Sequence, residues 1–157
     1  MHAADVGKQM QNSRDNSESG CHVDGVEMNQ IDYYQAKLDF EIDSADLFAA
    51  LNANSEDLVV VDARSAAAYA LEHIPTSISL PYRSLSDANV RDLDSHKLYV
   101  CYCDGVGCNA STKGALALAT LGFEVVELIG GLDWWKRDGY QTEGQAAQLG
   151  MQIDCGC

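Results

Sequence analysis

Apolar residues follow two different spacings along the chain from about residue 31 onwards. Short continuous apolar runs rich in β-branched residues predict buried strands, and apolar positions three or four residues apart predict helices. The predicted strands lie in "DLVVVDAR", "ISLPY", "KLYVCYC" and "EVVELIGG". The predicted helices lie in "DSADLFAALNAN", "SAAAYALEH", "NASTKGALALATLGF" and "LDWWKRDGY", the first of them capped by Asp43 or Ser44.

Two other stretches leave alternatives open. The segment "YYQAKLDFEI" is typical of an extended arm or a first strand, and "SLSDANVRDLDS" of a helical or irregular connection. Because strands and helices alternate, we expect an α/β fold with a central, mostly parallel sheet and helices on both faces.

The same pattern divides the chain into three parts. Residues 1–28 are polar and lack apolar periodicity, which predicts a flexible tail. Residues 29–143 form the predicted domain, and no internal repeat suggests a second one. Residues 144–157 form a C-terminal tail that ends in Cys-Gly-Cys and would either drape over the domain or stay loose.

Length and charge narrow the classes of partner. The 157 residues suffice for one buried core, and 24 acidic against 10 basic residues give a formal net charge of −14. Such a surface repels phosphate backbones and anionic membranes, so we expect neither nucleic acid nor a membrane as a partner. No apolar run approaches the roughly 20 residues that cross a bilayer, and the polar start lacks the apolar core of a secretory signal. These features predict a cytoplasmic protein.

The cysteines carry the candidate chemistry. There are six, namely Cys21, Cys101, Cys103, Cys108, Cys155 and Cys157. In a cytoplasmic chain they favour catalytic, redox or metal-binding roles over a disulfide framework. None of them forms the CxxC repeat of a zinc ribbon, and we predict neither a metal nor another cofactor.

Cys103 has the most telling position, at the carboxyl end of a predicted strand and just before a helix. Ligands bind at such ends in open α/β sheets. We expect Gly105 and Gly107 to adopt positive φ, so that loop N–H groups point inward and, with the helix N-terminus, lower the pKa of the Cys103 thiol.

A series of short motifs surrounds this cysteine in a fixed order. They comprise Asp62 and Arg64, Tyr69, His73, Ile74 and Pro75, Pro81, Cys103, Gly122 and Phe123, Gly130 and Gly131, and Trp135. In this order the chain resembles the rhodanese-like sulfurtransferase family, over about residues 42–140. The resemblance implies a rhodanese-like α/β fold and an enzyme, a sulfurtransferase.

By that resemblance Cys103 is the nucleophile. It would take a sulfane sulfur from a small donor, thiosulfate or a thiol persulfide, and hold it as a persulfide. The sulfur would then pass to cyanide or to a thiol acceptor, which could be protein-borne. The amides of the loop would stabilise the anion, and its residues are Asp104, Gly105, Val106, Gly107, Cys108 and Asn109.

The loop departs from the usual family pattern. The sixth position after Cys103 is Asn109 rather than a cation, and the nearest cation is Lys113, which would contact a substrate anion or remain solvated. Phosphatase relatives use an arginine at that position, so phosphatase activity is disfavoured. Asp104 would repel thiosulfate, which favours a thiol-type or protein-borne donor.

The remaining candidates have structural alternatives. Cys108 would either resolve a Cys103 persulfide as a disulfide or merely pack in the loop, and we expect Cys101 to be a buried core thiol. We predict that Asp62 and Arg64 make hydrogen-bonded structural contacts, including an ion pair to a neighbouring loop, and that His73 braces a loop. Trp135 should lie in the core and Trp134 at the surface.

Two alternatives to an enzyme remain. One is a non-enzymatic sulfur or metal carrier, and the other is a thiol redox sensor, each using Cys103, Cys108 and the C-terminal pair Cys155 and Cys157. The two C-terminal cysteines, with Cys21 beside His22, would relay sulfur, bind a soft metal, or lie in unstructured ends.

Overall fold

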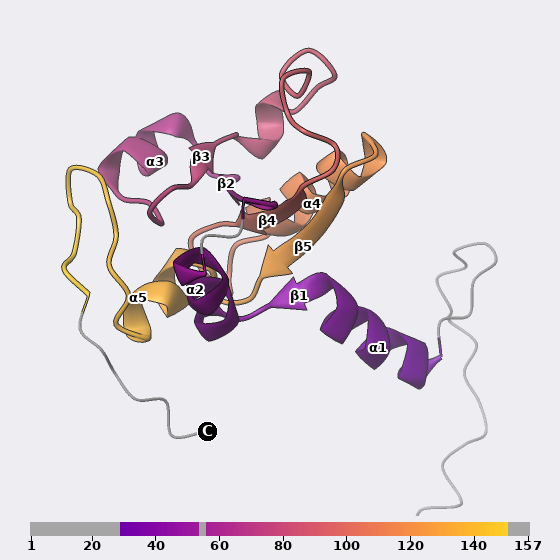
Figure 1. Ribbon diagram of the computed structural model, residues 1–157, viewed down its shortest axis with the longest axis horizontal. Helices are drawn as coiled ribbons and strands as arrows, with labels where there is room; N and C mark the ends of the chain where they lie inside the picture. Colours follow the sequence, from indigo (N-terminus) through magenta and orange to yellow (C-terminus); the bar gives the residue numbers. More distant parts are fainter. Residues whose placement is uncertain (1–28, 54–55, 151–157) are drawn as a thin grey trace, which may run out of the picture.

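The computed structural model describes residues 29–53 and 56–150. Its centre is a five-stranded sheet in the order β1-β5-β4-β2-β3, in which every neighbouring pair is parallel (Figure 1). The strands are β1 (Glu41–Ile42), β2 (Leu58–Asp62), β3 (Ile78–Ser79), β4 (Leu98–Tyr102) and β5 (Glu124–Leu128). The prediction of an α/β fold with a parallel sheet is confirmed.

Helices connect the strands. They are α1 (Gln30–Phe40), α2 (Ser44–Asn52), α3 (Ala66–Leu71), α4 (Ala110–Thr120) and α5 (Gly131–Arg137), with a short 3-10 helix η1 (Tyr82–Ser84). Asp43 is the N-cap of α2, because its carboxylate accepts a hydrogen bond of 2.8 Å from the Asp46 N–H. The connection from β3 to β4 contains η1 and is otherwise irregular.

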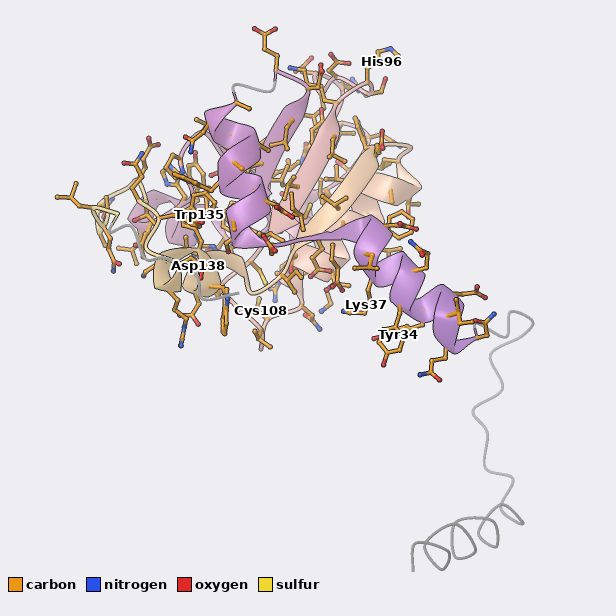
Figure 2. All side chains as sticks on the ribbon, turned by 60° about the horizontal axis from the view of Figure 1, so that its bottom comes forward. Tyr34, Lys37, His96, Cys108, Trp135 and Asp138 are labelled. Carbon is orange, nitrogen blue, oxygen red and sulfur yellow. The ribbon has the colours of Figure 1, made fainter. Side chains whose placement is uncertain are left out.

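The first helix contradicts the sequence prediction. An extended arm or strand was expected in this stretch, but only Glu41–Ile42 is extended, and the 11 residues before it form α1. The Asn29 side chain caps this helix, and Lys37 pairs with Glu41 one turn further on at 2.6 Å. Helix α1 buries none of its residues and projects away from the sheet (Figures 1 and 2). The cap and the side-chain pair therefore stabilise this helix locally, and the pattern of apolar residues does not predict it.

Each face of the sheet packs against its own helices. On one face α2 and α5 cover β2, β4 and β5, through a cluster that includes Leu47, Val60, Val100, Leu128 and Trp135. On the other face α4 packs over Val61, Tyr99 and Cys101, through Leu118. Helices on both faces are thus confirmed. Trp135 is 1% exposed and Trp134 is 46% exposed, as predicted.

The described part of the C-terminal segment lies against the domain. His73 and Glu143 exchange two backbone hydrogen bonds of 2.8 Å, and the Ala146 N–H donates to the Leu71 carbonyl at 2.8 Å. Residues 143–146 therefore lie along the end of α3, and the Gln148 carbonyl accepts a hydrogen bond of 3.0 Å from the Thr142 N–H. Residues 1–28 and 151–157, with Cys21, Cys155 and Cys157, lie outside the described residues. In the described ranges, no helix has both the length and the apolar content to span a membrane.

Candidate active site

Cys103 follows β4 directly, at the carboxyl edge of the sheet. Its carbonyl oxygen accepts a hydrogen bond of 2.9 Å from the Leu132 N–H, and the Asp104 carbonyl accepts one of 2.8 Å from the Asp133 N–H. The first turn of α5 is thus bound to the backbone around the cysteine. Gly131 permits this contact, because its φ is +56° and a Cβ there would lie 2.4 Å from the Cys103 oxygen.

The loop after Cys103 differs from the expected amide cradle. Neither Gly105 nor Gly107 has a positive φ; the glycines near the site that do are Gly130 and Gly131. Two loop carbonyls face the Cys103 Sγ instead, that of Cys108 at 3.2 Å and that of Gly105 at 3.8 Å. The reason is local: the loop closes as a turn in which the Cys108 N–H donates to the Gly105 carbonyl at 2.9 Å.

The environment of Cys103 raises the pKa of its thiol, contrary to the sequence expectation. Burial is the main cause, since the residue is 2% exposed, and the nearby Cys108 side chain adds to the effect. Hydrogen bonds with Ser111 act in the opposite direction, and the two side-chain atoms, Cys103 Sγ and Ser111 Oγ, are 3.1 Å apart. Burial outweighs them, so the thiol form is favoured at neutral pH.

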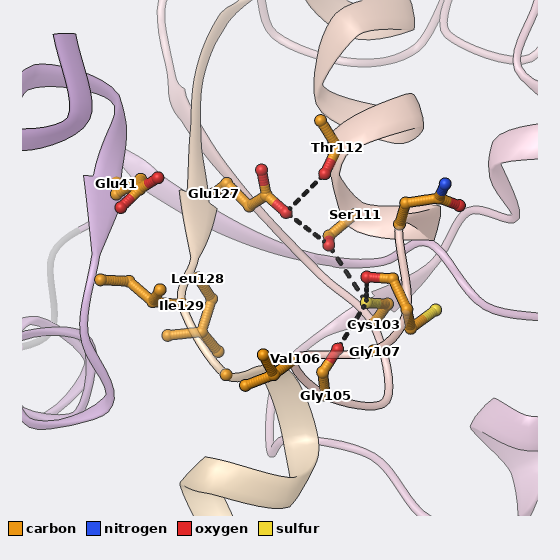
Figure 3. A pocket seen from close by; sticks show the side chains of 14 residues that line it. Glu41, Cys103, Gly105, Val106, Gly107, Ser111, Thr112, Glu127, Leu128 and Ile129 are labelled. Carbon is orange, nitrogen blue, oxygen red and sulfur yellow. Dashed lines mark hydrogen bonds between the residues drawn. The ribbon is translucent and has the colours of Figure 1, made fainter. Parts of the chain in front are cut away.

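The Cys103 sulfur opens onto a cleft of about 400 Å³ (Figure 3). Gly105, Val106, Gly107, Cys108 and Asn109 line it, so five of the six predicted loop residues surround the cleft. Ser111 and Thr112 of α4 and the carboxylates Glu41 and Glu127 also line it. No arginine or lysine lines the cleft among the described residues.

The two charged residues that were predicted to act near the sulfur lie elsewhere. Lys113 is not in the cleft lining, and its ammonium lies 5.4 Å from the centre of the Tyr82 ring. Asp104 is also outside the lining, and its carboxylate pairs with the Arg64 guanidinium at 2.9 Å. Because Arg64 offsets its charge, Asp104 is a weaker source of repulsion for an anionic donor than the sequence suggested. The role of Lys113 stays a prediction.

The structural roles expected for Asp62 and Arg64 are confirmed. The buried Asp62 carboxylate pairs with Arg64 at 2.6 Å and accepts a hydrogen bond of 2.7 Å from the Tyr102 hydroxyl. The carboxylates around Arg64 raise the pKa of its guanidinium. His73 braces a loop as predicted, through Nδ1, which is 2.7 Å from the Tyr69 carbonyl oxygen.

The other described cysteines differ in their surroundings. Cys101 is a buried core thiol, as predicted, and burial raises its pKa to about 12. Cys108 is partly exposed in the cleft wall. In the described parts of the chain, no group of three or more His, Cys, Asp or Glu side chains could hold a metal ion.

Sequence reasoning missed Ser111 and Glu127. The Glu127 Oε1 accepts hydrogen bonds from Ser111 at 2.7 Å and from Thr112 at 2.9 Å, which connects β5 to the start of α4 beside the cysteine (Figure 3). The only sequence signal was a carboxylate inside an otherwise apolar strand, "EVVELI". Such a residue needs a polar partner when it is buried.

Three comparisons bear on this site. A family model described as a rhodanese-like domain matches residues 44–138. A thiosulfate sulfurtransferase GlpE from Pseudomonas fluorescens is 40% identical over 80 residues, covering 50% of this chain and 70% of that protein. A thiosulfate sulfurtransferase GlpE from Pseudomonas entomophila is 37% identical over 89 residues, covering 55% of this chain and 78% of that protein. A crystal structure from Bacillus halodurans has a TM-score of 0.72 at 37% identity and covers 79% of this chain and 90% of its own.

Proposed function

Because the chain belongs to the rhodanese-like domain family, we propose that it is a sulfurtransferase that carries sulfane sulfur as a persulfide on Cys103. Its donors are thiosulfate or a thiol persulfide, and its acceptors are cyanide or a thiol, which includes protein thiols. The observation that carries the proposal is the position of Cys103, at the end of a central strand and in the wall of a cleft of about 400 Å³. The relatives named thiosulfate sulfurtransferase support it.

The reaction has two steps. First, the Cys103 sulfur attacks the sulfane sulfur of the donor; the donor's S–S bond breaks, and its leaving group departs with the bonding electron pair. Second, the acceptor attacks the outer sulfur of the persulfide, and Cys103 leaves as a thiolate that is protonated again. The cleft accommodates a small donor, and the walls around the thiol limit the access of water to the persulfide.

The first test is intact-protein mass spectrometry after incubation with thiosulfate, and separately with a thiol persulfide. The wild type should gain the mass of one sulfur atom, and cyanide should remove it. Cys103→Ser should gain nothing, whereas the matched control Cys101→Ser should behave as the wild type because Cys101 is buried in the core. A sulfur gain that persists in Cys103→Ser would contradict the proposal.

A thiol redox sensor is the second candidate. Its support is that Cys103 and Cys108 line one cleft and that Cys108 raises the pKa of Cys103. A mild oxidant such as a small-molecule disulfide or a peroxide accepts two electrons and two protons from the two thiols, which leaves Cys103 and Cys108 joined as a disulfide. Loss of two hydrogens on mild oxidation, with no sulfur gain from either donor, would favour this candidate. Zinc or copper in protein purified without chelator would favour a carrier.

A further inference from the structure

Glu127 is connected to the nucleophile by hydrogen bonds. Its Oε1 accepts from the Ser111 hydroxyl at 2.7 Å, and the Ser111 Oγ lies 3.1 Å from the Cys103 Sγ (Figure 3). Ser111 is 2% exposed and Cys103 is equally buried, so water has little access to either atom. The carboxylate on β5 can therefore act on the sulfur of Cys103 through one intervening hydroxyl.

The direction of these bonds follows from counting protons. A serine hydroxyl has one proton, and Ser111 donates it to Glu127. While that bond to Glu127 holds, the Ser111 oxygen can only accept from Cys103, which requires a proton on the sulfur; turned toward the sulfur instead, the same hydroxyl would lower the pKa of the thiol. The carbonyls of Gly105 and Cys108, which also face Sγ, are acceptors as well. A Cys103 thiolate would thus face three acceptor oxygens, against the hydrogen bond that the Ser111 backbone N–H donates to the sulfur, and this balance favours the thiol.

The carboxylates around the site also favour the protonated thiol of Cys103. Glu41 of β1 is the register partner of Glu127, and both carboxylates line the cleft. Glu127 also acts on neighbouring elements: the pKa of Lys37 is raised mainly by its hydrogen bond with Glu41 and further by Glu127, and the pKa of Cys101 is raised mainly by burial and further by Glu127.

The other ionisable groups near the site differ in their pairing. Lys37 pairs with Glu41, Asp104 with Arg64, and Asp133 with Arg137, while Cys108 is a free thiol. Glu127 forms no ion pair among the described residues; its carboxylate accepts from the Ser111 and Thr112 hydroxyls and attracts Lys37 only at longer range. Glu127 is therefore a carboxylate beside the sulfur without a cation in direct contact.

We propose that Glu127 is a positioning residue that keeps Cys103 protonated at rest through Ser111, and whose charge makes the cleft favour an uncharged persulfide donor over a dianion such as thiosulfate. This inference rests on the proposed sulfurtransferase function and names the class of its donor. A dianion would enter a cleft that two carboxylates and no cation line. A persulfide R–S–SH can enter uncharged.

The persulfide reaction needs no added oxidant or cation. The Cys103 thiol gives up its proton as its sulfur attacks the outer sulfur of R–S–SH, the donor's S–S bond breaks, and the group R–S leaves with the electron pair. The proton of the Cys103 thiol ends on that leaving group, which departs as R–SH. Reactants Cys103–SH and R–S–SH thus become Cys103–S–SH and R–SH, and the net charge stays unchanged throughout.

Alkylation of Cys103 tests the resting state independently of sulfur transfer. The rate with neutral iodoacetamide is measured against pH by peptide mass spectrometry for the wild type, Glu127→Gln and the control Glu124→Gln. Glu124 is an exposed residue of the same strand, and its change removes the same charge. In Glu127→Gln the amide can donate to Ser111, which frees the Ser111 proton for the sulfur.

We expect Glu127→Gln to react about tenfold faster at neutral pH, as a thiol pKa lower by about one unit implies, and to converge with the wild type at alkaline pH. In Glu127→Gln the alkylation rate with anionic iodoacetate should rise more than the rate with neutral iodoacetamide. Glu124→Gln should match the wild type with both reagents. Unchanged pH profiles and unchanged reagent preference in Glu127→Gln would overturn the proposal.

Sulfur donors complete the experiment. Persulfide formation on Cys103 is compared for thiosulfate and for the persulfide of 2-mercaptoethanol, which has no other ionisable group. Glu127→Gln should raise the thiosulfate rate relative to the persulfide rate severalfold, and Glu124→Gln should leave this ratio unchanged. If no donor loads Cys103 while the alkylation profiles shift as expected, the sulfurtransferase function fails and the role of Glu127 stands. If donors load Cys103 but the ratio does not move, the proposed donor preference fails alone.

Discussion

Two buried side chains at the carboxyl ends of β4 and β2, those of Cys103 and Asp62, lie in opposite electrostatic environments. Cys103 is buried among acceptor oxygens, which raises the pKa of its thiol. Asp62, the last residue of β2, is buried, and its carboxylate accepts hydrogen bonds from Arg64 and Tyr102. The first arrangement restrains reactivity, and the second fixes the loop that follows β4, because Arg64 also binds Asp104.

The Arg64 pair gives a prediction about stability. Arg64→Ala should lower the free energy of unfolding by about 3–5 kcal/mol, because it leaves the buried Asp62 carboxylate without its cation. Urea denaturation measures this loss. Asp104→Ala is the matched control: its carboxylate is 70% exposed, so its pair with Arg64 should contribute less than about 1 kcal/mol. Equal losses in the two variants would contradict the structural role of Asp62.

The starts of two helices, α5 and α4, pack against the ends of β4 and β5 and build the wall of the active site. Helix α5 begins at Gly131, and its first N–H groups bind the carbonyls of Cys103 and Asp104. Helix α4 begins after the loop and brings Ser111 and Thr112 to Glu127 on β5. The cleft therefore depends on the two helix starts meeting at the ends of β4 and β5.

A methyl group at Gly131 should disturb this junction. Gly131→Ala places a Cβ 2.4 Å from the Cys103 carbonyl oxygen at a φ of +56°. We expect a loss of at least about 1–2 kcal/mol in the free energy of unfolding, from the positive φ alone, and slower sulfur loading of Cys103. Gly107→Ala is the control, because a Cβ there meets nothing within 4 Å. If thermal unfolding ranks the two variants equally, the close approach of α5 to β4 is wrong.

Taken together, the chain presents a strongly acidic body to its substrates. The formal net charge is −14, and the carboxylates Glu41 and Glu127 line the cleft itself. Such a field lowers the local concentration of small anions and raises that of cations. The rate with an anionic donor should therefore depend on the ionic strength of the solution.

Salt distinguishes donors by their charge. Sulfur loading of Cys103 from thiosulfate should become severalfold faster between about 0.01 M and 0.15 M salt, because the Debye length falls from about 30 Å to about 8 Å. Loading from a persulfide, which carries at most one negative charge, should change less. Stopped reactions analysed by intact mass give both rates. A thiosulfate rate that is independent of salt would show that the overall charge does not reach the cleft.

Part of this picture follows from local patterns. Apolar runs such as "DLVVVDAR" and "KLYVCYC" predicted β2 and β4, because a strand covered on both faces must be apolar throughout. The cap of α2 at Asp43 was predicted in the same way. Helix α1 was not, since its stability lies in Asn29 and in side-chain pairs rather than in a buried face.

The amino-acid sequence alone determined the parallel α/β architecture, the position of Cys103 after a strand, and the structural role of Asp62 and Arg64, because each was inferred from patterns of residues that are neighbours along the chain. The tertiary structure placed Glu127 beside Ser111, although 16 residues separate them, and turned the loop carbonyls rather than its amides toward the sulfur. It also paired Asp104 with Arg64 across 40 residues and Cys103 with the start of α5. Such contacts arise only when separate elements meet, and their geometry depends on how the whole core packs.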